Sequence, residues 1–176
     1  MGVRPVLRLG DPRLRRVSAE VPEELFGSAS LESLIADLRD TMAERHGAGL
    51  AAPQIGVPWR VVIYGITHNP RYPEAPPIPE TVLINPRLSP IGEGVQLGWE
   101  GCLSVPGLRG QVQRWQRLQL AWRSVDGQRL ERAVEGFHAR VVQHECDHLD
   151  GLLFVDRLSS SQAFGFDQEL QAAGQL

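Results

Sequence analysis

The sequence predicts an α+β fold in which a histidine-bearing helix packs among mainly antiparallel β-strands, with a further helix near the N-terminus. Helical spacing occurs near both ends of the chain, and the strand-like segments between them show no regular alternation of strand and helix. An Asp-Gly pair at 126–127 separates two strand-like segments, which is typical of an antiparallel hairpin. Because the chain has 176 residues, 42% of them hydrophobic, we expect one domain over 1–176.

The first elements follow from proline, capping residues and apolar spacing. Proline interrupts residues 1–27, which predicts irregular chain with a short helical turn at 11–17. A helix should follow, because Ser30 can cap it and apolar residues recur at spacings of three and four over 31–42. Gly47 is expected to end this helix.

The middle of the chain predicts loops and strands in turn. The glycine-rich segment 47–58 indicates a loop, and the β-branched segment 59–66 indicates a strand. Five prolines in the thirteen residues of 68–80 predict a stiff loop or insertion. Strand-like sequence resumes at 81–85, so this insertion is not a domain linker.

The last third of the chain predicts a hairpin, a helix and a short tail. Residues 112–125 alternate in part, and 130–134 supply the returning strand of the hairpin. A second helix is predicted over 137–149, followed by a short apolar strand at 152–155. The tail favours a short helix over 164–170.

Charge and composition exclude several classes of function. The formal net charge is −3, whereas general nucleic-acid binders and polybasic membrane proteins are typically basic. All 18 basic residues are arginine, which excludes Schiff-base and P-loop lysine chemistry. No apolar segment approaches the ~18 residues of a membrane span, and the start lacks the apolar core of a signal peptide. We therefore expect a cytoplasmic protein with no membrane or direct nucleic-acid site, whose two cysteines are free thiols or metal ligands.

The strongest chemical signal is the HExxH pattern at 144–148. On a helix, His144 and His148 lie four residues apart on one face, so two imidazoles can bind one metal ion. Glu145 follows the first histidine, where a carboxylate can accept a proton from an activated water and pass it on. The alternative is a surface helix with two incidental histidines.

A catalytic metal site of this kind needs a third protein ligand. After His148 the chain has no further histidine and only one glutamate, Glu169, in the tail. Cys102 lies in the segment WEGCLS, and a thiolate with two imidazoles suits a borderline-soft metal. The alternative for Cys102 is a buried apolar cysteine. Cys146 lies on a different face of the helix and is expected to pack in the core.

The glycine-rich segment could bind a substrate. Gly47 and Gly49 would allow a substrate backbone to approach closely, and Gln54 offers an amide hydrogen-bond donor. The alternative is that this segment is a simple turn with no role in binding. The spacing differs from the GxGxxG of dinucleotide sites, and no strand leads into it.

Together the three segments resemble the peptide deformylase family. The family is marked by GxGLAAxQ, EGCLS and QHExDHL segments in that order. Here they occur as GAGLAAPQ at 47–54, EGCLS at 100–104 and QHECDHL at 143–149. The resemblance covers residues 47–157 most strongly, and the N-terminal helix fits it.

The resemblance implies a role for each matching residue. Glu145 would be the general acid and base, and Gln54 and the backbone N–H of Leu103 would stabilise the developing oxyanion. Glu100 and Arg114 would form a pair that steadies the Cys102 loop. The implied metal ligands are Cys102, His144 and His148.

The resemblance also implies the reaction and its partners. The family removes the N-formyl group from the N-terminal formyl-methionine of nascent polypeptides, so 1–176 would be a single catalytic domain. One divalent metal is implied, with Fe²⁺ preferred and Ni²⁺, Co²⁺ or Zn²⁺ able to substitute. The implied partners are nascent formyl-methionyl peptides and, as a further candidate, the ribosome. Two alternatives are an HExxH metallopeptidase and a non-catalytic peptide- or ribosome-binding protein with a structural metal.

Overall fold

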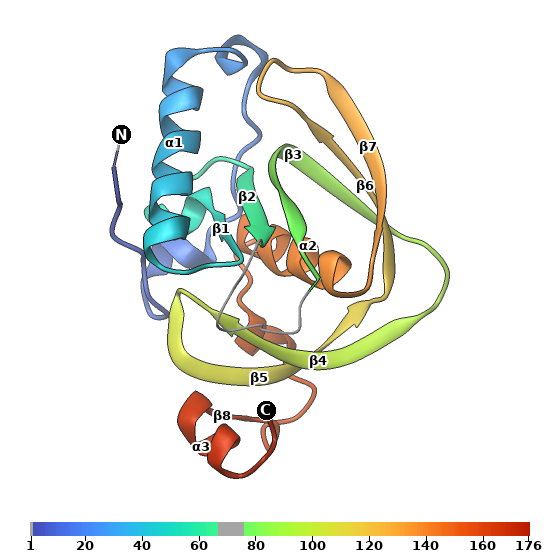
Figure 1. Cartoon of the computed structure of the whole chain (residues 1–176). Coiled ribbons are helices and arrows are strands. Elements are labelled where there is room, and N and C mark those ends of the chain that lie inside the picture. The colour runs from blue at the N-terminus through green and yellow to red at the C-terminus, as the bar shows by residue number, and fades with distance from the viewer. Residues whose placement is uncertain (1, 67–75) are drawn as a thin grey trace.

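The computed structural model describes residues 2–66 and 76–176, and it confirms the α+β architecture (Figure 1). The α-helices are α1 (Ala29–Glu44), α2 (Gly136–Leu149) and α3 (Asp167–Ala172). The strands are β1 (Gly49–Ala51), β2 (Val61–Ile66), β3 (Ile78–Pro90), β4 (Val95–Cys102), β5 (Val105–Trp115), β6 (Arg117–Arg123), β7 (Arg129–Glu135) and β8 (Phe164–Phe166).

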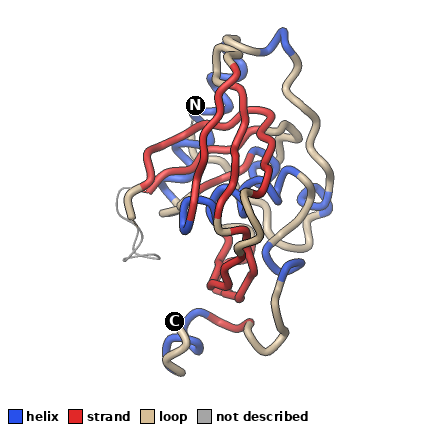
Figure 2. Tube along the Cα trace, turned by 90° about the vertical axis from the view of Figure 1, so that its right-hand side faces the viewer, coloured by secondary structure: helices blue, strands red, loops and turns tan. Residues whose placement is uncertain are grey.

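Among the described residues the strands form two antiparallel sheets. One sheet has the strand order β1-β2-β3-β6-β7, and the other has the order β4-β5-β8. Figure 2 shows the strands from the side, with the C-terminal segment of β8 and α3 at one end of the molecule. No helix in 2–66 or 76–176 combines the length and apolar character needed to cross a membrane.

Helix α2 lies at the centre of the fold. Figure 1 shows it with α1 on one side and the β6–β7 hairpin on the other. Every residue from 139 to 149 is buried, so its polar side chains must find partners inside the protein. The predicted helix at 137–149 is therefore confirmed, and its polar residues face a protein interior rather than solvent.

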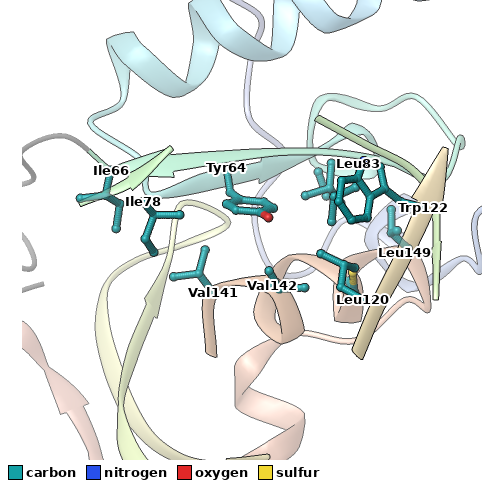
Figure 3. Packing of buried hydrophobic residues seen from close by; sticks show 12 residues of the cluster. Tyr64, Ile66, Ile78, Leu83, Leu120, Trp122, Val141, Val142 and Leu149 are labelled. Atoms are coloured by element: carbon teal, nitrogen blue, oxygen red, sulfur yellow. The ribbon is translucent and has the colours of Figure 1, made fainter. Parts of the chain in front are cut away.

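The main core fills the space between α2 and the five-stranded sheet. Figure 3 shows Tyr64, Leu83 and Leu120 of the sheet facing Val142 and Leu149 of α2. Cys146 belongs to this cluster and is 5% exposed, so its expected place in the core is confirmed. A second cluster packs α1 against the other face of β2.

The N-terminal helix begins earlier than predicted. Ser28 is the N-cap, because its hydroxyl accepts a hydrogen bond from Leu31 N at 3.3 Å, whereas the predicted cap Ser30 lies within the helix. The helix ends at Glu44, and the N–H of Gly47 bonds back to its last turn. The short helical turn predicted at 11–17 is confirmed as a 3-10 helix.

The glycine-rich segment 47–58 is not only a loop. Strand β1 pairs with β2, and a 3-10 helix follows at Ala52–Ile55. Strand β1 has three residues and all are buried, so it has no alternating pattern that could predict it. The strand predicted at 59–66 is confirmed as β2.

The proline-rich segment is only partly covered by the structure. Residues 67–75 lie outside the described residues, so the loop predicted at 68–80 is tested only at its end. Residues 78–80 already belong to β3, despite Pro79, because proline is tolerated at the start of a strand. The strand predicted at 81–85 is confirmed as part of β3.

The predicted hairpin is confirmed, but its first strand is shorter. The segment 112–125 is divided at Gln116, whose N–H leaves the ladder and bonds to Gly94 O at 2.9 Å. The turn closes where Ser124 N donates to Gln128 O at 2.9 Å.

The C-terminal predictions need two corrections. The strand predicted at 152–155 is wrong, because Phe154–Arg157 is a 3-10 helix stabilised by Asp156, whose carboxylate accepts a hydrogen bond from Leu153 N at 2.8 Å. The short helix predicted at 164–170 is present as α3, but it begins only at Asp167, because Phe164–Phe166 form strand β8 and pair with β5.

Candidate active site

One face of α2 presents the three polar residues of the HExxH pattern. His144 and His148 are one helical turn apart, and their rings lie 5.0 Å apart at nearly a right angle. Glu145 is beside them, and all three side chains are buried. The helical spacing predicted from sequence therefore places both imidazoles and the carboxylate together.

Cys102 completes a cluster with the two histidines. It ends strand β4, where the register with β5 is interrupted. One ligand atom from each of Cys102, His144 and His148 lies within 4.8 Å of the others. The Sγ atom of Cys102 is 3.4 Å from Nε2 of His148. A buried thiol close to two imidazoles fits a divalent, borderline-soft metal.

The other ring nitrogen of each histidine is already engaged. His144 Nδ1 donates to Glu100 Oε2 at 2.8 Å, and His148 Nδ1 donates to the carbonyl oxygen of Leu152 at 3.1 Å. These bonds select the tautomer whose Nε2 lone pair is available, as metal-binding histidines require.

The surroundings of Cys102 favour the thiolate. Burial alone would raise the pKa of its thiol, but the neighbouring His148 and His144 outweigh burial and hold the pKa well below its usual range. The opposite holds for Cys146, where burial raises the pKa of the thiol. The two cysteines therefore differ in chemistry as well as in position.

Glu145 is a buried carboxylic acid with an unpaired oxygen. Among the described residues, its Oε2 has no hydrogen-bond partner. Burial raises its pKa to about 7, although His144 and His148 act in the opposite direction. A carboxyl group that can gain or lose a proton near neutral pH suits general acid–base chemistry.

Gln54 is held firmly beside the cysteine. Its Oε1 accepts a hydrogen bond from Ala51 N at 2.9 Å, which directs its Nε2 toward the end of β4. Nε2 donates to Ser104 Oγ at 3.1 Å and lies 3.5 Å from Cys102 Sγ. The amide that the sequence singled out, together with the neighbouring Leu103, therefore adjoins the ligand cluster.

A small cavity of about 40 Å³ adjoins this cluster. Both glycines singled out in the sequence line it, and so do Leu103 and Glu145. His148 and Arg114 lie just behind this lining, against Cys102 and Glu100. Residues that the sequence analysis did not assign to a site also line the cavity: Phe137, Arg140 and Val141.

The expected contact between Glu100 and Arg114 is present. Nε and Nη2 of Arg114 donate to the two oxygens of Glu100, each at 2.9 Å, in a buried bidentate pair. Arg140 also donates to Glu100, at 2.8 Å, and sequence reasoning missed this residue. Its position, four residues before His144, is the signal that could have placed it on the same helical face.

Comparisons with known proteins lead to a single family. The family described as "Polypeptide deformylase" matches residues 3–164. "Peptide deformylase 1" of Prochlorococcus marinus is 58% identical over 175 residues, covering 99% of this chain and 90% of the relative. A Met-Ala-Ser-bound crystal structure of the class I type b peptide deformylase from Acinetobacter baumannii is 42% identical with a TM-score of 0.86, covering 89% of this chain and 98% of that one.

A more distant structure leads to the same family. The crystal structure of peptide deformylase from Thermotoga maritima is 31% identical with a TM-score of 0.80, and covers 91% of this chain and 100% of that one. The chain therefore belongs to the polypeptide deformylase family, hydrolases that remove the N-formyl group from nascent peptides.

Proposed function

We propose that this deformylase acts on formyl-methionyl peptides at a metal centre held by Cys102, His144 and His148. The observation that carries the proposal is the convergence of three buried ligand atoms within 4.8 Å of one another. Three protein ligands leave an open position for water and substrate. When bound there, a divalent metal supplies Lewis-acid chemistry, lowering the pKa of water and polarising the formyl carbonyl.

Glu145 is proposed as the general base and then the general acid. It adjoins both histidine ligands, and its free Oε2 can accept the proton of the attacking water. The same oxygen can then deliver that proton to the amine nitrogen as the bond to the formyl carbon breaks. A pKa of about 7 supports both directions of transfer.

Two donors are proposed to stabilise the oxyanion of the tetrahedral intermediate. The Nε2 amide of Gln54 is held by contacts to Ala51 and Ser104, so it would be oriented before substrate binds. The backbone N–H of Leu103 immediately follows Cys102 in the chain. Pre-oriented donors of this kind strengthen their interaction as negative charge develops.

The substrate backbone is proposed to lie along Gly47 and Gly49, which line the cavity. The Acinetobacter structure with Met-Ala-Ser supports a peptide that begins with methionine. We further propose Fe²⁺ as the native metal, with Ni²⁺, Co²⁺ or Zn²⁺ as substitutes. Because formylated chains emerge during synthesis, we propose action in the cytoplasm near the ribosome.

The test compares substrates under anaerobic conditions with Fe²⁺-loaded protein. We expect rapid release of formate from formyl-Met-Ala-Ser, with no cleavage of an internal peptide bond in a longer unformylated peptide. Cleavage of the internal bond at a similar rate would favour a metallopeptidase. Bound metal without release of formate or cleavage of either peptide would favour a structural metal.

A further inference from the structure

We infer that Asp147 and Arg157 are positioning residues for the metal centre, acting on His144 through Arg114 and Glu100. The inference rests on the proposed ligand set. It extends the pair of Glu100 and Arg114 outward, to a residue of α2 and a partly exposed arginine.

The inner half of this chain of contacts ends at a metal ligand. Glu100 accepts a hydrogen bond from His144 Nδ1 at 2.8 Å on one side, and is held by Arg114 on the other. Arg114 uses Nε and Nη2 for Glu100, and its Nη1 points to a different partner. Arg140 also donates to Glu100, so the position of the carboxylate behind His144 depends on Arg140 and on how Arg114 is held.

The outer half begins at Nη1 of Arg114. Arg114 Nη1 donates to Asp147 Oδ2 at 2.5 Å. Arg157 approaches the same carboxylate from the other side, with Nε at 2.6 Å from Oδ2 and Nη2 at 2.8 Å from Oδ1. Asp147 therefore bridges two guanidinium groups, one deeply buried and one 44% exposed.

Burial makes each member of this network depend on the next. The Arg114 side chain is 4% exposed and that of Asp147 is 10% exposed, so water replaces few of their contacts. Removing one charge from such a buried network leaves an opposite charge without compensation. Without the Asp147 charge, Glu100 would be the sole carboxylate paired with Arg114. The stronger pull of Arg114 on Glu100 would weaken the hydrogen bond that Glu100 accepts from His144.

The consequence should appear in metal affinity. A carboxylate that accepts the Nδ1–H of a ligating histidine makes Nε2 a better donor and fixes the plane of the ring. Weakening that acceptor lowers the affinity of the site, even though Asp147 and Arg157 are not ligands. Residues that bond directly to a metal ligand typically change affinity about 10–100-fold. Asp147 acts through Arg114 and Glu100, so we expect a loss of about 10-fold for Asp147→Asn, the lower end of that range.

The chain offers a control carboxylate at the C-terminal end of the same helix. Asp150 follows the last residue of α2 and forms an ion pair with Arg60 at 2.7 Å. Both Asp147 and Asp150 line a larger cavity, of about 1120 Å³, on a face of α2 away from the ligand cluster. Asp150→Asn removes a neighbouring carboxylate that also pairs with an arginine, although its side chain is 53% exposed, and it leaves the chain of contacts to Glu100 intact.

The experiment follows transfer of Co²⁺ from the loaded, full-length protein to a competing chelator. The thiolate-to-cobalt absorption reports the site directly, without reference to turnover. We expect weaker Co²⁺ binding in Asp147→Asn, a smaller loss in Arg157→Gln, and no change in Asp150→Asn. The loss of Co²⁺ affinity in the double variant Asp147→Asn/Arg157→Gln should be smaller than the product of the losses in the two single variants. Both substitutions disrupt the same interaction, so their effects do not add in free energy.

Unchanged affinity in both Asp147→Asn and Arg157→Gln, or an equal loss in Asp150→Asn, would overturn the inference. If Asp147→Asn fails to fold, the partly exposed Arg157→Gln decides alone, and normal affinity in that variant overturns it. Cys102→Ser separates this outcome from a failure of the proposed ligand set. Loss of the thiolate absorption in Cys102→Ser supports the ligand set, whatever the behaviour of Asp147.

Discussion

Gly49 lies directly against the carboxyl group of Glu145. A methyl group at Gly49 would be 2.5 Å from Oε1 and 2.7 Å from Cγ of Glu145, well inside van der Waals contact. Strand β1 therefore approaches α2 as closely as only glycine permits. From the sequence, Gly49 was expected to let the substrate backbone approach closely. The contact with Glu145 gives it a second role, because it also limits the position of the buried carboxylate.

We predict that Gly49→Ala lowers kcat about 100-fold, because misplacing a reacting group by about 1 Å can cost that much. Metal content should stay normal, since none of the proposed ligands is the residue displaced. Steady-state kinetics and metal analysis would test this. Gly165→Ala is the control, because its added methyl would meet only ordinary contacts at 3.4 Å. Normal kcat in Gly49→Ala would contradict the close packing.

Glu145→Gln should retain the metal and lose nearly all turnover. The amide keeps the shape of the side chain but cannot accept the proton of water. General acid–base catalysis contributes about 10²–10⁴-fold, and a residue that serves both transfers could exceed that range. Single-turnover assays with measured metal content would test this. Half of the parent activity in a fully metallated variant would exclude Glu145 as the acid–base group.

Gln54→Ala should reduce kcat on the order of 10²–10³-fold and change KM much less, as expected for loss of one oxyanion donor. Ser104→Ala is an informative companion, because it removes only the hydroxyl that accepts from Gln54 Nε2. We expect Ser104→Ala to have a smaller effect, since the bond from Ala51 still orients the amide. A large rise in KM with normal kcat would instead make Gln54 a ground-state binding residue.

Exposure of the Fe²⁺ form to air should inactivate the protein through oxidation of Cys102. The pKa of Cys102 is depressed by the two histidines, and oxidation follows thiolate character and access. Cys146 should stay reduced, because burial raises its pKa. The Ni²⁺ or Co²⁺ form should survive. Peptide mass spectrometry would locate the modification, and oxidation confined to Cys146 would argue against a thiolate ligand at Cys102.

Much of the site could be predicted because its signals are local. Two histidines four residues apart on a helix must share a face, whatever surrounds them, and α2 confirms this for His144 and His148. The third ligand could not be predicted from a local pattern, because the residues around Cys102 are equally compatible with a buried cysteine that binds no metal. The family resemblance selected Cys102, and the structure brings its sulfur to the histidines across 42 residues of sequence from His144.

Two of the strands that the sequence analysis did not predict, β1 and β4, were missed because neither shows a clear alternation of buried and exposed residues. Strand β1 is too short to show a period, and β4 contains glycines and exposed apolar residues that blur its alternation. Both strands are defined by pairing with a partner that lies elsewhere in the chain. The predicted cap at Ser30 was wrong for a related reason, since two nearby serines both satisfy the local preference.

The sequence alone determined the fold class, the helix of the HExxH pattern and the residue types of the site, because helical spacing and turn chemistry act over a few residues. Only the tertiary structure decided which buried side chains bond to those residues and hold them in place. Arg140 and Arg157 carry no motif of their own, and Asp147 lies in the QHExDHL segment without an assigned role. Arg140 meets Glu100, Asp147 meets Arg114, and Arg157 meets Asp147, because the fold packs β4, β5, α2 and the 3-10 helix at Phe154–Arg157 together. Buried charges need partners, and folding brings those partners from distant parts of the chain.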